Sequence, residues 1–88
     1  MSRLVRLSSS FLRAYRRHGV VPGTVGARRI AAAIRLLGAT PELPGRDDLE
    51  FLMPPALTGF LRAVPETGFV LAYAVTDAEL VVLTLRVG

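Results

Sequence analysis

The sequence predicts an α+β fold in which two helices pack on an antiparallel sheet, in the order β-α-α-β-β-β. In the first half, apolar residues recur at helical spacing behind Ser and Thr residues that can cap a helix. In the second half, three strand-length runs rich in Val, Leu, Phe and Tyr are separated by turn residues. With 88 residues, 51% of them hydrophobic, the chain is expected to form one small domain over residues 1–88.

The first strand is predicted over residues 3–7, and the first helix follows the serines at positions 8–10. Any of these serines can accept a hydrogen bond from the free N–H groups that open a helix. Phe11, Leu12 and Tyr15 share one face of this helix, and its arginines lie on or near the solvent side. The first helix is therefore expected to be amphipathic and basic.

A short turn separates the first helix from a second one. Gly19 suits the left-handed position just after a helix, and Thr24 can cap the next helix. Gly38 is expected to close the second helix. The apolar face of this helix is formed by Ile30, Ala33, Ile34 and Leu37.

The predicted sheet contains the strands Phe60–Val64, Gly68–Val75 and Glu79–Val87, joined by short turns that favour antiparallel hairpins. The segment Thr40–Pro55 holds four of the six Pro and is expected to be an irregular loop. In the last strand, strict alternation predicts a core face and an opposite face that carries Arg86. The predicted core face consists of Val81, Leu83, Leu85 and Val87, and the opposite face of Leu80, Val82, Thr84 and Arg86.

Charge is distributed unevenly along the chain. Residues 1–46 hold nine Arg against one acid, whereas residues 47–88 hold two Arg against six acids, for a net charge of +4. This division predicts one surface that attracts anions, and nucleic acid is the obvious anion. The alternative explanation of the arginine excess is GC-rich coding. Every basic residue apart from His18 is Arg, and the chain lacks Lys, Asn and Gln.

Several functional classes are excluded or disfavoured by composition. The chain has no Cys, which excludes disulfides, thiolate metal sites and Cys nucleophiles, and its single His18 cannot build a polyhistidine zinc site. No metal or cofactor is therefore expected. The longest apolar stretch, Phe69–Val75, is far shorter than the roughly 20 residues that span a bilayer. We expect a cytoplasmic protein with no membrane partner; residues 1–10 lack the apolar run of a secretory signal but leave a mitochondrial transit peptide open.

Two short segments and their spacing carry a resemblance to a known family. The first is Leu57-Thr58-Gly59-Phe60, and thirteen residues later comes Ala74-Val75-Thr76-Asp77. Together with the order of elements, this pattern resembles the YoeB/Txe branch of the RelE/ParE toxins over nearly the whole chain. The resemblance implies a RelE-like fold and the toxin of a type II toxin-antitoxin module, an endoribonuclease that cuts mRNA in the ribosomal A site. It also implies a cognate antitoxin, the ribosome and mRNA as partners.

In that family, the ribose 2′-hydroxyl attacks the neighbouring phosphate, which needs a base, cations and an acid but no metal. The resemblance places Glu50 at the position of the base. Arg86 matches an Arg of the branch, and Arg62 is a candidate RNA contact at a position that does not match. The alternative interpretation of Glu50, Arg86 and Arg62 is that each is a surface residue that contacts solvent or forms a salt bridge. Arg28 and Arg35 of the second helix are further candidate RNA-binding residues, together with Arg13, Arg16, Arg17 and Arg29.

The sequence departs from the family pattern at three functional positions. Val70 stands where the family has its phosphate-binding Arg, and the closing His-Tyr pair expected after Arg86 is missing. Whether that pair was lost or the chain is truncated after Gly88 is left open. His18, at the end of the first helix, is expected to be a cap facing the helix dipole and not a displaced acid.

Four functions therefore stay open. One is an mRNA endonuclease, and another is a catalytically degenerate homologue that binds only its antitoxin or the ribosome. The third is a gyrase-inhibiting toxin of the ParE type, and the fourth an unrelated small basic RNA-binding module. The sequence leaves open the oligomeric state, the antitoxin and any codon preference.

Overall fold

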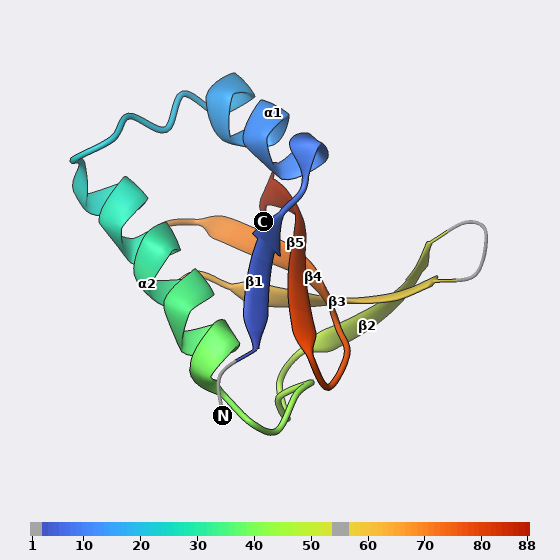
Figure 1. Cartoon of the computed structure of the whole chain (residues 1–88). Helices are drawn as coiled ribbons and strands as arrows, with labels where there is room; N and C mark the ends of the chain where they lie inside the picture. The colour runs from blue at the N-terminus through green and yellow to red at the C-terminus, as the bar shows by residue number, and fades with distance from the viewer. Residues whose placement is uncertain (1–2, 54–56) are drawn as a thin grey trace.

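The computed structural model of the chain, which describes residues 3–53 and 57–88, has an α+β fold of two helices and a five-stranded sheet (Figure 1). The expectation of two helices and a sheet is confirmed, with one strand more than the order β-α-α-β-β-β. The elements are β1 (Leu4–Leu7), α1 (Ser9–Arg17), α2 (Val25–Ala39), β2 (Leu49–Met53), β3 (Leu57–Ala63), β4 (Phe69–Val75) and β5 (Glu79–Val87).

The sheet is mixed, whereas the sequence predicted an antiparallel one. Its strand order is β1-β5-β4-β3-β2. Strands β2 to β5 form an antiparallel meander, but β1 pairs parallel with β5, with Leu4 opposite Glu79 and Leu7 opposite Val82. A parallel neighbour requires a crossover connection. The chain makes that crossover by passing through both helices and the meander before it returns beside β1.

Strand β2 corrects the prediction that Thr40–Pro55 is irregular throughout. Leu49–Met53 pairs antiparallel with β3, which itself begins at Leu57 and not at Phe60. Proline cannot donate a hydrogen bond to a sheet ladder, so a Pro-rich segment disfavours a strand. The prolines of this segment all lie outside Leu49–Met53, where they do not interrupt the ladder.

The predicted helix caps are confirmed. The Ser8 hydroxyl accepts a hydrogen bond from the Phe11 N–H at 3.0 Å, and the Thr24 hydroxyl accepts one from the Ala27 N–H at 3.3 Å. Gly19 follows α1 with a φ of +67°, a left-handed conformation that favours glycine. Gly38, expected to end the second helix, lies inside α2 instead. A Cβ at Gly38 would lie 2.6 Å from Val5 Cγ2, so the glycine lets α2 approach β1 closely.

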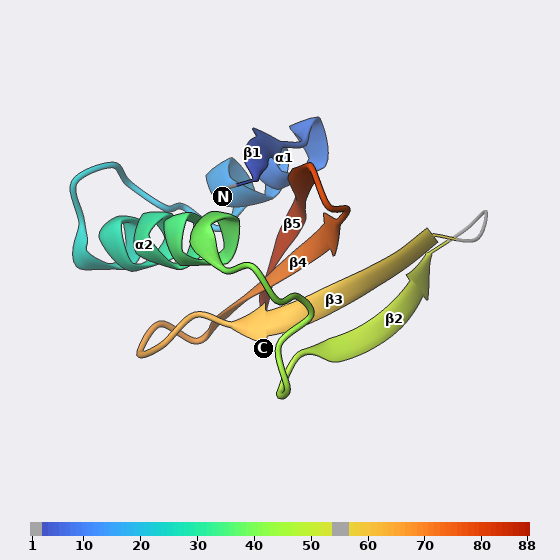
Figure 2. The same cartoon turned by 60° about the horizontal axis from the view of Figure 1, so that its bottom comes forward.

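Both helices cover the same face of the sheet, and the core lies between these two layers (Figure 2). Tyr73 at the centre of β4 is fully buried. Leu12, expected on the apolar face of the first helix, is 45% exposed, and Ala14 is buried in that helix instead. The core cluster consists of Phe11, Ala14, Ile30, Leu37, Val64, Leu71, Tyr73, Leu80, Val82 and Leu85.

A β-bulge changes the inward face of β5. Val82 pairs with Tyr73 and Thr84 pairs with Ala72, which leaves Leu83 without a matching residue in β4. A single extra residue moves all later side chains to the other face of the sheet. The buried positions of β5 are therefore Leu80 and Val82 before the bulge and Leu85 after it. Of the predicted core face, Leu85 is buried as expected, whereas Val81, Leu83 and Val87 are not. The prediction that Leu80 and Val82 point away from the core is wrong, and Arg86 is exposed as expected.

Candidate functional site

Glu50, the candidate base, lies in β2 and is exposed. It stands opposite Phe60 in β3, which in turn stands opposite Tyr73 in β4. Paired residues in neighbouring antiparallel strands point to the same face of a sheet. Because Tyr73 belongs to the core under the helices, Glu50 lies on the helix side of the sheet, on the strand farthest from β1.

Arg86 lies on the opposite face of the sheet from Glu50. It stands opposite Val70 in β4, and Val70 stands opposite Ala63 in β3. Strands β5 and β2 are separated by two others, and neighbouring strands lie about 4.8 Å apart, so this separation alone amounts to about 14 Å. The structure therefore does not bring Glu50 and Arg86 together at a single phosphate.

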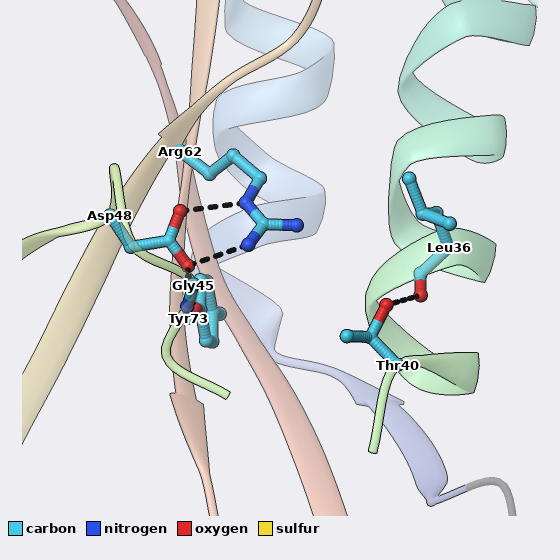
Figure 3. A network of polar contacts seen from close by, with 6 residues as sticks. All are labelled: Leu36, Thr40, Gly45, Asp48, Arg62 and Tyr73. Carbon is cyan, nitrogen blue, oxygen red and sulfur yellow. Dashed lines mark hydrogen bonds and ion pairs between the residues drawn. The ribbon is translucent and has the colours of Figure 1, made fainter. Parts of the chain in front are cut away.

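Arg62, the third candidate, is held by a carboxylate. Its Nε and Nη2 donate to Asp48 Oδ1 and Oδ2 at 2.7 Å and 2.8 Å, a two-pronged ion pair (Figure 3). The same carboxylate accepts a hydrogen bond from the Gly45 N–H at 2.8 Å and another from the Tyr73 hydroxyl. The Asp48 side chain is only 2% exposed, against 26% for Arg62. The structure thus brings Arg62 together with Asp48, and not with Glu50 or Arg86.

This network shifts the pKa of each ionisable member. Burial alone would raise the pKa of Asp48, but the hydrogen bonds from Arg62, Tyr73 and the Gly45 N–H outweigh burial and lower it. The hydrogen bond to Asp48 raises the pKa of Arg62. Burial, and then the hydrogen bond to Asp48, raise the pKa of Tyr73. The charges of Asp48 and Arg62 therefore neutralise each other within the fold. An RNA-binding role for Arg62 stays a prediction.

Asp48 is not among the residues predicted for the site, because it stands beside Asp47 and Glu50 in a segment typical of solvated acidic residues. No spacing marks its partners, since Arg62 and Tyr73 lie 14 and 25 positions away.

The two helices carry arginines and no acidic residue. Of these arginines, only Arg29 takes part in an ion pair among the described residues, with Glu66 at 2.6 Å. Arg28 and Arg35, both predicted to bind RNA, are exposed on α2. We call the solvent-exposed surface of the two helices the arginine face. Its exposed arginines are Arg13, Arg16, Arg17, Arg28, Arg29 and Arg35.

An apolar groove of about 200 Å³ lies between α1 and α2. Leu12 on α1 and Ala31 on α2 are exposed at its mouth. Arg16 lies one helical turn after Leu12, and Arg28 and Arg35 lie one turn before and after Ala31, so arginines flank both walls. The groove is lined by Leu7, Phe11, Leu12, Tyr15, Ala27, Ile30, Ala31 and Ile34. We call it the helical groove.

His18 occupies the C-cap position of α1, as expected. Its backbone N–H donates to the Ala14 carbonyl at 2.9 Å, and its ring lies 5.9 Å from the Phe69 ring. The structure therefore places His18 at a helix end beside an aromatic ring of β4.

Within residues 3–53 and 57–88, no three acidic or His side chains lie close enough together to hold a metal ion. In the same part of the chain, neither helix has the length and apolar character needed to cross a membrane. Comparisons of the chain with known protein families, with curated proteins and with solved structures find no match.

Proposed function

We propose that this chain is a RelE/ParE-like toxin homologue that binds an acidic antitoxin through the helical groove and does not cleave RNA. The family part of this proposal is supported by the order of the elements, in which one strand and two helices precede an antiparallel meander. It is also supported by the segment resemblance that ends in Asp77, at the turn between β4 and β5.

The observation that carries the binding part is the combination of an apolar groove with arginine-bearing walls. Neither helix offers an acid to neutralise these arginines. An apolar groove suits the apolar side of an amphipathic segment, which buries its hydrophobic residues there. Acidic residues on the flanks of that segment would meet Arg16, Arg28 and Arg35, and complementary charge raises the association rate and excludes wrong partners. The expected partner segment is therefore amphipathic and acidic.

Three observations disfavour RNA cleavage. Glu50 and Arg86 lie on opposite faces of the sheet, Arg62 is paired with Asp48, and Val70 provides no charge. The reaction needs a base, cations and an acid around one phosphate. Since the loss of one such electrostatic contact costs about 3 kcal/mol of transition-state stabilisation, the loss of several leaves little activity.

A direct test uses a designed helical peptide with Leu at positions i, i+4 and i+7 and Glu at the flanking positions. A matched peptide in which Lys replaces every Glu serves as the control. We expect the Glu peptide to bind and the Lys peptide not to bind, measured by fluorescence anisotropy. Equal binding of both peptides would contradict the charge part of the proposal.

Two neighbouring alanines of α2 supply a matched pair of variants. Ala31 and Ala32 are both exposed, but only Ala31 lines the helical groove, whereas Ala32 faces a cleft on the other side of α2. Ala31→Glu places a like charge against the acidic peptide and is expected to weaken binding at least about tenfold, which corresponds to about 1.4 kcal/mol. Ala32→Glu is expected to bind within about twofold of the wild type, a change of about 0.4 kcal/mol. Equal losses in both variants would place the peptide elsewhere.

RNA is the second candidate ligand, and the exposed Arg28 and Arg35 favour it. Phosphate contacts of this kind do not depend on sequence and weaken steeply with salt. A short single-stranded RNA, titrated beside the peptide, tests this candidate. RNA is favoured over an acidic protein if two results are found together. Arg28→Glu and Arg35→Glu would abolish RNA binding, and Ala31→Glu and Ala32→Glu would change it equally.

A further inference from the structure

The sheet face opposite the helices has no element covering it within the described residues (Figure 2). The register assigns side chains to this face, because residues paired with Val70, Ala72 and Ala74 point away from the core. Apart from Arg6, Glu79, Thr84 and Arg86, the face consists of apolar residues. Six large ones represent all five strands: Leu4, Leu49, Phe51, Leu61, Val70 and Val81. We call this surface the open face.

Several side chains at the margins of the open face are strongly exposed. Leu4 on β1 and Leu49 on β2, the two outermost strands of the sheet, are 69% and 67% exposed. Between them, Leu61, Val70 and Val81 on the inner strands are partly exposed. Contiguous apolar surface that crosses a whole sheet is uncommon on proteins that stay monomeric.

The total accessible surface is also large for the mass. The chain exposes 5833 Å², whereas a compact monomer of its mass exposes about 5,000 Å². The excess of about 800 Å² matches the share that one partner buries in a protein interface of standard size.

Charge identifies the occupant of the open face. The arginine face of one copy would repel the same face of another copy. The open face has little net charge, because Arg6 and Glu79 pair at 3.1 Å and, among the residues that the structure describes, Arg86 is the one other charged residue there. We infer that a second copy of this chain covers the open face, in a two-fold dimer that packs sheet against sheet.

This arrangement gives the two sides of the molecule different partners. The dimer buries the apolar side chains of both open faces against each other, at the spacing of about 10 Å that packed sheets adopt. The helices lie on the outer sides of such a dimer. The helical groove of each copy therefore stays accessible.

The test compares two Leu→Lys variants with similar exposure. Leu49 on the open face is 67% exposed, and Leu36 on α2 is 62% exposed. Because neither side chain is buried, neither substitution is expected to unfold the chain, which far-UV circular dichroism checks. The measurement is the molar mass by sedimentation equilibrium over a series of protein concentrations, at physiological salt.

We expect the wild type and Leu36→Lys to sediment as dimers, at twice the chain mass of 9.5 kDa. Leu49→Lys buries two like charges in the interface and is expected to raise the dissociation constant at least about tenfold. A second open-face variant, Val81→Lys, is expected to act in the same direction. A wild type that stays monomeric at every concentration, or equal effects of Leu36→Lys and Leu49→Lys, would overturn the inference.

Salt separates this inference from the proposed function. Each copy carries a net charge of +4, so screening reduces repulsion between copies and is expected to strengthen the dimer. Binding of the acidic peptide is expected to weaken under the same conditions. A dimer that dissociates as salt rises would place the contact on charged surfaces and contradict an apolar interface, whatever the peptide does.

Discussion

At the residue scale, Asp48 holds together parts of the chain that are distant in sequence. Its carboxylate joins the loop before β2 to Arg62 of β3 and Tyr73 of β4. A buried carboxylate without partners would be costly, but here four donors satisfy it. Asp48 therefore fixes the path of the loop that leads from α2 into the sheet.

Asp48→Asn is expected to lower the free energy of unfolding by about 3 kcal/mol. The substitution removes the counter-charge of Arg62 and replaces an acceptor oxygen with a donor beside the Gly45 N–H. Urea denaturation measures the loss. Asp47→Asn is the control, because Asp47 is exposed and its removal is expected to change stability by no more than about 0.5 kcal/mol. Similar effects of both substitutions would contradict a special role for Asp48.

The same network predicts a stability maximum between acidic and alkaline limits. The pKa of Asp48 is lowered by folding, so its contribution is complete above the unfolded pKa of about 3.9 and is lost as pH falls through the folded pKa. The pKa of Tyr73 is raised by folding, so its contribution is complete below about pH 10 and is lost as pH rises further.

Thermal unfolding as a function of pH checks both limits. Asp48→Asn is expected to flatten the acidic limb, and Tyr73→Phe is expected to flatten the alkaline limb. Tyr73→Phe also removes one hydrogen bond, at a cost of about 1 kcal/mol near neutral pH. A variant whose pH profile runs parallel to that of the wild type would show that the substituted group does not titrate with folding.

At the element scale, α2 is positioned by two features that local patterns did not reveal. Gly38 allows its last turn to approach β1, and Arg3 donates to the carbonyls of Thr40, Pro41 and Thr76. These contacts tie the end of α2 to the turn before β5. The position of α2, and with it the width of the helical groove, therefore depends on contacts at its C-terminal end.

Gly38→Ala is expected to destabilise the fold by about 1–3 kcal/mol through overpacking, although Ala favours a helix more than Gly does. In a Val5→Ala background, where the clashing methyl group is removed, the same substitution is expected to cost less or to stabilise. Gly26→Ala in the same helix meets no atom within 4 Å and is expected to stabilise by about 0.5 kcal/mol. Denaturant unfolding of the wild type and of the four variants, including Val5→Ala alone, measures these signs. Loss of stability at Gly38 that Val5→Ala does not relieve would contradict the packing argument.

At the scale of the whole molecule, the two sides of the sheet differ. Two arginine-bearing helices pack on one face, and no element of the described residues packs on the other. Glu50 is on the helix side and Arg86 is on the open face, so these two candidate residues do not face one phosphate. The arginine face and the open face instead offer two surfaces of opposite character, one charged and one apolar. The proposed binding function rests on this division.

Purified protein at saturating concentration is therefore expected to leave mRNA uncut in cell-free translation. Primer extension on the recovered message checks for discrete 3′ ends. Glu50→Gln is expected to behave like the wild type, since Glu50 has no cationic partner among the described residues. Discrete cleavage that Glu50→Gln abolishes would overturn the proposed binding function and restore the endonuclease.

The sequence alone determined both helices, their Ser8 and Thr24 caps, and four of the five strands, because these depend on residues within a few positions of one another. Tertiary structure decided the parallel pairing of β1, the inward face of β5 after its bulge, and the partners of Asp48. It also decided that Glu50 and Arg86 lie on opposite faces. These features depend on how segments up to 75 positions apart meet in space, and local periodicity contains no information about such pairings.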